Sequence, residues 1–313
     1  MTITARPIRH IASWAGTILA LGVAGPLLLP LPRLAGSNPA ELAGPDDLFV
    51  ELDGLRVRYR TWGAGPSGFL LLHGFGSNVD SWEPVAAGLA DRGRVVAFDR
   101  VGFGLTDRPD DRRRYAGEAQ VQLAVRLLDH LGLDDVVVVG HSAGGAIALA
   151  LALDHPVSGL VLEAPSLDPP PGWLHLLART PQGQRLVRFA ARRAAERMPW
   201  VLPDTYHDPT KLEDQILAAY RRPLGVRDWD IGFARFVAAR PVAGLRRRLD
   251  DLQVPTLVIT GDDDRWIPTD ESISLSTEIA GSTLVVTPEC GHVVHEECPQ
   301  QFVDAVTRWL GSR

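Results

Sequence analysis

A serine set among glycines is the first residue of this chain whose surroundings suggest chemistry. Ser142 lies in the pentapeptide Gly140-His141-Ser142-Ala143-Gly144. The apolar run DVVVVG precedes it and the run AGGAIALALAL follows it, so we expect a strand, a sharp turn and a helix. Glycine removes the β-carbons that would obstruct such a turn. The pattern predicts a nucleophilic serine, and the alternative is a serine that only caps a helix.

A serine hydroxyl needs a base to take its proton, and nine histidines could supply one. His292 follows the apolar run TLVVTP (283–288) and precedes a closing helical stretch, so its loop can reach back over the strand ends. We predict that His292 is the base, with His295 as its nearest rival. His141 adjoins the nucleophile and is expected to point away from it, and His73 is expected to shape its loop by hydrogen bonding.

An acid that fixes the orientation of the base is expected after another strand. The segment Asp262-Asp263-Asp264 directly follows the apolar run TLVITG (256–261). One of these carboxylates can be buried against a histidine while the others stay solvated, and residue type alone does not choose among them. Glu163, at the end of the run GLVLEA, is a second acid position, unless it forms a structural ion pair.

The negative charge that develops on a substrate carbonyl needs two hydrogen-bond donors. The amide of Ala143, at the start of the expected helix, is one candidate. The second is the amide of Phe75, because Gly74 and Gly76 on either side allow the backbone to turn inward. A plain glycine-rich turn is the alternative for this segment.

The elements that must position these residues alternate between strand-like and helix-like segments. Strands are expected at 48–52 and 55–62, 69–74, 94–99, 135–140, 159–164, 256–261 and 283–288, and helices at 80–91, 117–131, 143–153, 270–280 and 299–311. This rhythm predicts an α/β fold with a mostly parallel central sheet flanked by helices. Residues 166–250 interrupt it with helical stretches near 173–199, 211–221 and 229–239. We therefore expect core segments at 44–165 and 251–313 and an inserted helical lid at 166–250.

Composition excludes several classes of protein. The 313 residues are 45% hydrophobic with a net charge of −6, and no basic stripe suggests a nucleic-acid partner. Cys290 and Cys298 are expected to be free thiols, although a bridge between them stays open. No spacing of histidine and cysteine predicts a metal site, and no cofactor is expected.

The N-terminus carries a long uncharged stretch, residues 11–32, preceded by Arg6 and Arg9. Its length suits a membrane-spanning anchor that places the catalytic part outside the cytoplasm, in a bacterial-type envelope. A signal peptide cleaved after Ala24, which would release a secreted protein, and an arm packed on the domain are the alternatives. We treat residues 1–43 as this anchor or signal segment and its linker.

Taken together, the motifs resemble the α/β-hydrolase superfamily from about Leu48 to Leu310. The segments that carry the resemblance are HGFG (73–76), FDRVGFGLTDRP (98–109), GHSAG (140–144), GDDDRWIP (261–268) and CGHVVHEECP (290–299). The family's acid pattern, G-x-x-D-x-x-x-P, falls on Gly261, Asp264 and Pro268. The resemblance therefore implies Asp264 as the acid, supports His292, and implies a helical lid.

Within this superfamily the residue type at the position of Ser142 distinguishes members that catalyse different reactions. Relatives with aspartate there, the haloalkane dehalogenases and epoxide hydrolases, are excluded. The resemblance implies a serine hydrolase of the esterase or meta-cleavage-product-hydrolase branch, acting on a small-molecule or lipid-like ester as a carboxylesterase does, or on a related acyl or C–C bond. A perhydrolase or acyltransferase, and a binding protein without turnover, are the alternatives. Trp173 and Trp266 are candidate substrate contacts, or else core residues.

Overall fold

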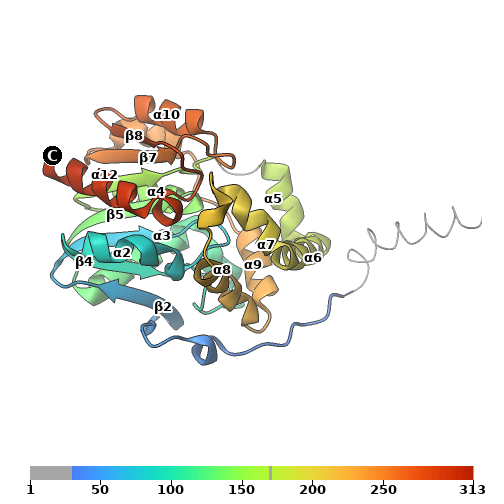
Figure 1. The fold of residues 1–313 in the computed structure, drawn as a ribbon. Coiled ribbons are helices and arrows are strands. Elements are labelled where there is room, and N and C mark those ends of the chain that lie inside the picture. The colour runs from blue at the N-terminus through green and yellow to red at the C-terminus, as the bar shows by residue number, and fades with distance from the viewer. Residues whose placement is uncertain (1–29, 169–170, 313) are drawn as a thin grey trace, which may run out of the picture.

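An eight-stranded sheet forms the centre of the computed structural model, which describes residues 30–168 and 171–312 (Figure 1). Its strand order is β1-β2-β4-β3-β5-β6-β7-β8, antiparallel from β1 to β4 and parallel from β4 to β8. The strands are β1 (Leu48–Leu52), β2 (Leu55–Trp62), β3 (Ser67–Leu72), β4 (Arg94–Phe98), β5 (Asp135–His141), β6 (Gly159–Glu163), β7 (Thr256–Gly261) and β8 (Thr283–Thr287). The predicted α/β fold and its mostly parallel sheet are confirmed.

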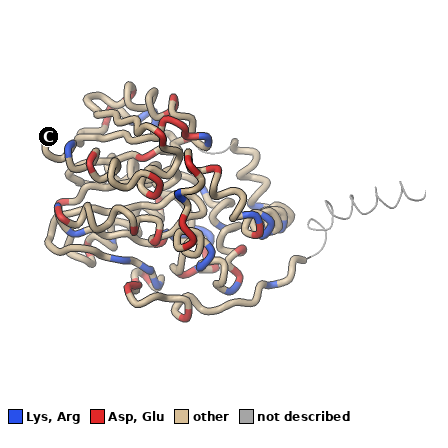
Figure 2. The backbone as a smooth tube through the Cα atoms, viewed as in Figure 1, with Lys and Arg blue, Asp and Glu red and all other residues tan. Residues whose placement is uncertain are grey.

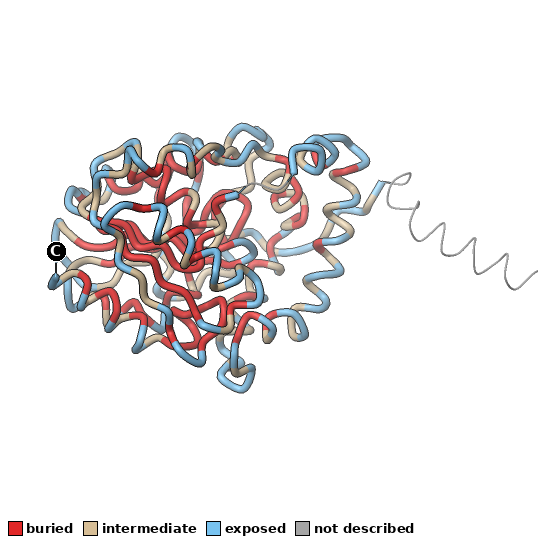
Figure 3. Tube along the Cα trace, turned by 90° about the horizontal axis from the view of Figure 1, so that it is seen from above, coloured by how far each residue is buried: buried red, intermediate tan, exposed pale blue. Residues whose placement is uncertain are grey.

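Helices cover both faces of the sheet, because successive strand residues point to opposite sides. In β5, Val136 and Val138 pack into one hydrophobic core, and Val137 and Val139 into another. The first core lies against α3 (Gly117–Leu131), α4 (Ala143–Asp154) and α10 (Thr269–Glu278), and the second against α2 (Glu83–Ala90) and α12 (Pro299–Ser312). Figure 3 shows the strands as a buried layer. Burial on both faces explains why these strands are continuous apolar runs.

Between β6 and β7 the described residues form only helices and loops, which lie together beyond one end of the sheet (Figure 1). The helices are α5 (Gly172–Arg179), α6 (Pro181–Glu196), α7 (Met198–Val201), α8 (Asp214–Arg221) and α9 (Trp229–Val237), with short 3-10 turns between them. We call residues 166–250, the segment predicted to be an inserted lid, the lid. The single stretch expected near 173–199 is three helices, because Pro181 begins α6 and Pro199 lies in the first turn of α7.

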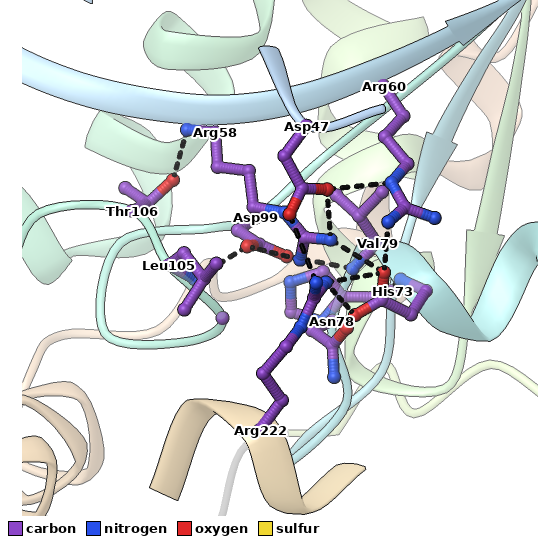
Figure 4. Close-up of polar contacts among 12 residues, drawn as sticks. Asp47, Arg58, Arg60, His73, Asn78, Val79, Asp99, Leu105, Thr106 and Arg222 are labelled. Carbon is purple, nitrogen blue, oxygen red and sulfur yellow. Dashed lines mark hydrogen bonds and ion pairs between the residues drawn. The ribbon is translucent and has the colours of Figure 1, made fainter. Parts of the chain in front are cut away.

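A buried cluster of charges joins the lid to the core (Figure 4). Arg58 on β2 is fully buried and pairs with Asp47 and Asp80 at 2.6 Å and with Asp99 at 3.1 Å. Burial disfavours the charge of Arg58, but the three carboxylates outweigh this and raise its pKa. Arg222 of the lid reaches the same cluster, 3.1 Å from Asp47. The lid is therefore fixed to the core at this point by charge-assisted hydrogen bonds.

Residues 30–47 form a strap that crosses the lid before the first strand begins. Arg33 pairs with Asp228 at 2.6 Å, and the amide of Leu34 donates to the same carboxylate at 3.0 Å. Ser37 then forms a parallel bridge with Val226. Charged residues of both signs occur in the core as well as in the lid (Figure 2).

The prediction of a membrane anchor at residues 11–32 needs correction. Of this stretch only Pro30 to Pro32 belong to the described residues, and these three are not helical. None of the helices within residues 30–168 and 171–312 combines the length and apolar character that a membrane span needs, and the longest, α6, has 16 residues and carries several arginines. On this finding we withdraw the transmembrane helix and the membrane-anchored or secreted placement.

The prediction of two free thiols is also wrong. Cys290 and Cys298 form a disulfide, with their Cα atoms 6.4 Å apart. The short helix α11 (Val294–Glu297) lies between them and turns the chain back on itself, so that residues eight positions apart meet. The bridge closes the loop that carries His292.

Candidate active site

The backbone at Ser142 has a conformation that few residues with a side chain adopt. Its φ is 50° and its ψ is −121°, between the end of β5 and the start of α4. The Ser142 carbonyl accepts from the amides of Gly145 at 2.9 Å and Ser166 at 3.0 Å, and its own amide donates to Glu163. A β-carbon at Gly144 would overlap the carbonyl oxygen of Leu72. The turn thus depends on a glycine and on bonds from β6 and α4.

His292 and Asp264 form a buried hydrogen-bonded pair, with Nδ1 of the histidine 2.8 Å from Oδ2 of the carboxylate. They come from the loops after β8 and β7, whose carboxyl ends meet at one edge of the sheet together with that of β5. Because a carboxylate can only accept, the bond places the imidazole proton on Nδ1 and leaves the lone pair on Nε2.

The three consecutive aspartates have three different environments. Asp264 is buried, and its Oδ1 accepts from the amides of Trp266 and Ile267, both at 2.9 Å. Asp263 instead binds the surface residues Arg265 and His207. Asp262 is exposed and accepts from an amide at 3.3 Å. Of the three, only Asp264 is brought together with His292.

His295 and Glu163, the alternative candidates for base and acid, pair with each other. Both the ring nitrogen Nδ1 and the amide of His295 bond to Oε1 of Glu163, at 2.8 and 2.9 Å. Burial opposes the charge of His295, but Glu163 outweighs it and raises the pKa of this imidazole. In the sequence nothing connects these two residues, which lie 132 positions apart. The pair forms the structural ion pair that was one alternative for Glu163.

His141 does not point away from the site as predicted. It lines the same cavity as Ser142, and its Nε2 lies 3.2 Å from the carbonyl oxygen of His292. That bond requires the proton on Nε2. Burial and the neighbouring His292 lower the pKa of His141 well below its usual value, so the ring is neutral. It supports the loop of His292 without adding charge.

Both predicted oxyanion donors belong to segments that lie next to the nucleophile. Ala143 begins α4, and Phe75 follows Gly74, whose position for a β-carbon is only 3.2 Å from Cβ of Ser142. Within the described chain neither amide donates to a backbone acceptor. His73 accepts from the amide of Arg100 through Nε2, and its Nδ1 donates to the Gly74 carbonyl at 2.8 Å. His73 therefore shapes this loop by hydrogen bonding, as predicted.

A cavity of about 320 Å³ lies between the core and the lid. Ser142, His292 and Phe75 line it, and among the described residues of its lining Arg108 alone carries a permanent charge. Most of the remaining wall comes from apolar lid residues, among them Met198, Leu202, Leu224, Trp229 and Phe233. Such a cavity suits a small, largely apolar ligand.

One of the two tryptophans predicted to contact substrate lies at the cavity and the other does not. Trp266 is part of the lining, and its ring lies parallel to that of His292 with the centroids 6.1 Å apart. Trp173 is 67% exposed and is not part of the lining, which corrects that prediction. It lies on α5, whose outer face the sequence could not distinguish from its inner one.

Two groups of residues bring several metal-ligand atoms together in the described chain. His141, Glu163 and His295 form one group, but their hydrogen bonds to one another and to the loop of His292 account for it. The other contains Cys290 and Cys298, whose sulfurs are joined in the disulfide and so are not thiolates.

Comparisons with known proteins agree with this architecture. A sequence profile described as "Alpha/beta hydrolase family" matches residues 69–305. A 2-hydroxymuconate semialdehyde hydrolase from Pseudomonas is 33% identical over 275 residues, covering 82% of this chain and 91% of that protein. A dihydrolipoyllysine-residue acetyltransferase component of an acetoin cleaving system, from Cupriavidus necator, is 29% identical and covers 88% and 74%.

A solved structure is similar over nearly its full length. The crystal structure of a mutant of CumD, a meta-cleavage product hydrolase, matches with a TM-score of 0.67 and 25% identity. The match covers 85% of this chain and 98% of that one.

Proposed function

Since the chain belongs to the alpha/beta hydrolase family, we propose that it hydrolyses a bond beside a carbonyl group in a small, largely apolar substrate. Ser142 is the proposed nucleophile, His292 its base and Asp264 the acid that orients the base. One observation carries the proposal: the 2.8 Å bond between His292 and Asp264, beside a cavity that His292 and Ser142 both line.

The mechanism follows from where the protons lie. With Nδ1 donating to Asp264, Nε2 of His292 is free to accept the Ser142 proton as the oxygen attacks the carbonyl carbon. The amides of Phe75 and Ala143 donate to the resulting oxyanion. His292 then returns the proton to the leaving group, and a water molecule releases the acyl group from Ser142.

A carboxylic ester is the first candidate substrate. Cavities of several hundred Å³ hold small organic molecules, and an apolar wall favours an alkyl or aryl group over a charged one. The tryptophan beside the base, Trp266, offers a flat surface to such a group.

A C–C bond next to a ketone is the second candidate, and the names of the relatives favour it. The 33% identical relative is called a 2-hydroxymuconate semialdehyde hydrolase, and the matching solved structure a meta-cleavage product hydrolase. The same serine, base and acid would serve, with a carbon leaving group in place of an alkoxide. Transfer of the acyl group to an acceptor other than water has some support from the acetyltransferase relative.

One screen tests the proposal and separates the candidates. The wild type and Ser142→Ala are assayed on p-nitrophenyl esters of increasing chain length and on 2-hydroxymuconate semialdehyde, with and without an added alcohol acceptor. We expect Ser142→Ala to lower turnover of the preferred substrate by about 10⁴- to 10⁶-fold. The substrate class with the larger kcat/KM, esters or the semialdehyde, shows whether the enzyme cleaves an ester or a C–C bond. A variant that retains most of the wild-type turnover would eliminate Ser142 as nucleophile.

A further inference from the structure

A buried arginine without a carboxylate partner among the described residues lies behind the proposed oxyanion site. Arg100, which follows β4, is 1% exposed, and its guanidinium hydrogen-bonds to the carbonyl oxygen of Gly74, at 3.1 Å from Nη2. Its Nε is buried and has no hydrogen-bond partner within the described chain. Burial lowers the pKa of Arg100 to about 9, so it remains charged at neutral pH.

The nearest carboxylate along the chain is committed elsewhere. Asp99 Oδ2 accepts from Arg58 at 3.1 Å and from the amide of Leu105 at 2.6 Å, and its Oδ1 accepts from the amide of Val79 at 2.7 Å (Figure 4). Arg100 is instead covered by aromatic rings, with its guanidinium carbon 5.2 Å from the centroid of Phe103 and 5.6 Å from that of Phe236. These contacts reduce the cost of burying the charge but do not neutralise it.

Packing alone does not require this charge. A methionine side chain would pack against the same two rings without the cost of burying a guanidinium. We therefore expect the charge to act on Gly74, because the Gly74 carbonyl is the acceptor that the guanidinium reaches in the described part of the chain.

The Gly74–Phe75 peptide links that charge to the site. A trans peptide is planar, with its C=O and N–H on opposite sides. The carbonyl is held from one side by Nη2 of Arg100 and by Nδ1 of His73. The N–H of Phe75 must then point the other way, and Gly74 is next to Ser142. A cation bonded to the carbonyl also polarises the peptide, which makes its N–H a stronger donor.

We propose that Arg100 is a positioning residue for the oxyanion site, fixing the Gly74 carbonyl so that the amide of Phe75 faces the developing negative charge. This inference rests on the proposed function, because it assigns a role in stabilising the oxyanion on a carbonyl attacked by Ser142. Arg100 itself touches neither substrate nor nucleophile.

The test compares Arg100→Met, which keeps the packing, and Arg100→Lys, which keeps the charge. Arg113→Met is the matched control, since that side chain is 91% exposed. Each variant is assayed on the substrate that the screen identifies as preferred. Each is also titrated with a trifluoromethyl ketone, which forms an oxyanion on Ser142, and with the corresponding alcohol, which does not.

We expect Arg100→Met to lower kcat by about 10²-fold with little change in KM, as the loss of one oxyanion donor does. Affinity for the ketone should fall by a similar factor while affinity for the alcohol is kept, and Arg100→Lys should recover part of both. If the methionine variant does not fold, Arg100→Gln, which keeps a donor without the charge, must lower kcat and ketone affinity together by a smaller factor and leave alcohol affinity unchanged.

A wild-type kcat in the folded variants, or an equal loss of ketone and alcohol binding, would overturn the role of Arg100. A wild type that hydrolyses none of the screened esters or the 2-hydroxymuconate semialdehyde, and does not react with the ketone, would instead refute the proposed function, and the inference with it. The two failures are therefore distinguishable.

Discussion

At the scale of single residues, Asp264 shows what the structure adds to the sequence. Residue types left three adjacent aspartates equivalent, and only the resemblance to the α/β-hydrolase superfamily selected one. The folded turn distinguishes them, because two amides and one imidazole converge on Asp264 while its neighbours meet solvent or surface side chains. These contacts depend on the directions of the backbone amides in the turn after Asp264, which residue types alone do not determine.

Asp264→Asn should lower kcat/KM by about 10⁴-fold, because an amide in this position favours the wrong tautomer of His292. Asp263→Asn is the matched control on the preceding residue, and its activity should stay within about threefold of the wild type, since exposed ion pairs contribute little. Steady-state kinetics on the preferred substrate measures both. Equal effects of the two substitutions would remove Asp264 as the orienting acid.

The backbone of Ser142 carries strain that a variant can release. A residue with a β-carbon held at φ 50° and ψ −121° costs on the order of 1–3 kcal/mol, whereas glycine adopts this conformation readily. We therefore expect Ser142→Gly to be more stable than Ser142→Ala by about 1 kcal/mol, after the greater chain entropy of unfolded glycine is subtracted. Urea denaturation of the two variants gives the difference. A less stable glycine variant would show that the turn is not strained.

At the scale of elements, the buried strands were predictable as short continuous apolar runs, and the helix at 117–131 from apolar residues spaced at about 3.6 positions. The helix at 117–131 was predicted to the residue. The lid was harder. Apart from α6 its helices are short, and many of their residues are exposed, so neither their number nor the direction of Trp173 followed from the pattern.

A second link between lid and core involves a carboxylate that accepts from two lid tyrosines. Tyr206 and Tyr220 donate to the two oxygens of Glu296, at 2.8 and 2.7 Å. All three residues are buried. Desolvation raises the pKa of Glu296 despite these bonds, so its carboxyl group is sensitive to the loss of a donor.

Tyr206→Phe should lower the free energy of unfolding by about 1–3 kcal/mol, because one oxygen of a buried carboxyl group loses its donor. Tyr59→Phe on β2, half-buried, is the comparison and should change stability by less than about 1 kcal/mol. Urea denaturation measures both. Hydrogen exchange should also rise in α8 and the turns beside it. Equal losses in the two variants would mean that the Glu296 link does not hold the lid.

At the scale of the whole molecule, buried histidines set the response to acid. Burial, and then the charge of Arg100, lower the pKa of His73 well below its ordinary value near 6.5. Below that pH His73 is protonated in the unfolded chain but not in the folded chain, so the free energy of unfolding falls as the pH falls. His295, whose pKa is raised, acts in the opposite direction: its contribution is present below about 6.5 and is lost as the pH rises through its folded value.

His73→Asn isolates one of these effects. The free energy of unfolding of the wild type should fall more steeply than that of the variant between about pH 6.5 and 5.5, by up to about 1.4 kcal/mol per pH unit. Urea denaturation at constant ionic strength gives both slopes, whatever the variant's absolute stability. Parallel slopes would mean that His73 binds its proton equally in the folded and the unfolded chain, so that its pKa is not lowered on folding.

The overall architecture and the region of the site followed from the order of the motifs, since parallel strands bring their carboxyl ends to one edge. Contacts that depend on long-range packing did not, including the pairing of Glu163 with His295 and the ion-pair cluster around Arg58. Patterning predicts which face a residue occupies but not which partner it meets there.

The central claim is that Ser142 is a nucleophile activated by His292. Its most direct test is labelling of the folded wild type with a fluorophosphonate, followed by peptide mass spectrometry. We predict one adduct, on Ser142, that is absent from Ser142→Ala and forms much more slowly in Asp264→Asn. Folded protein that stays unlabelled, or that carries the adduct on another residue, would contradict the account.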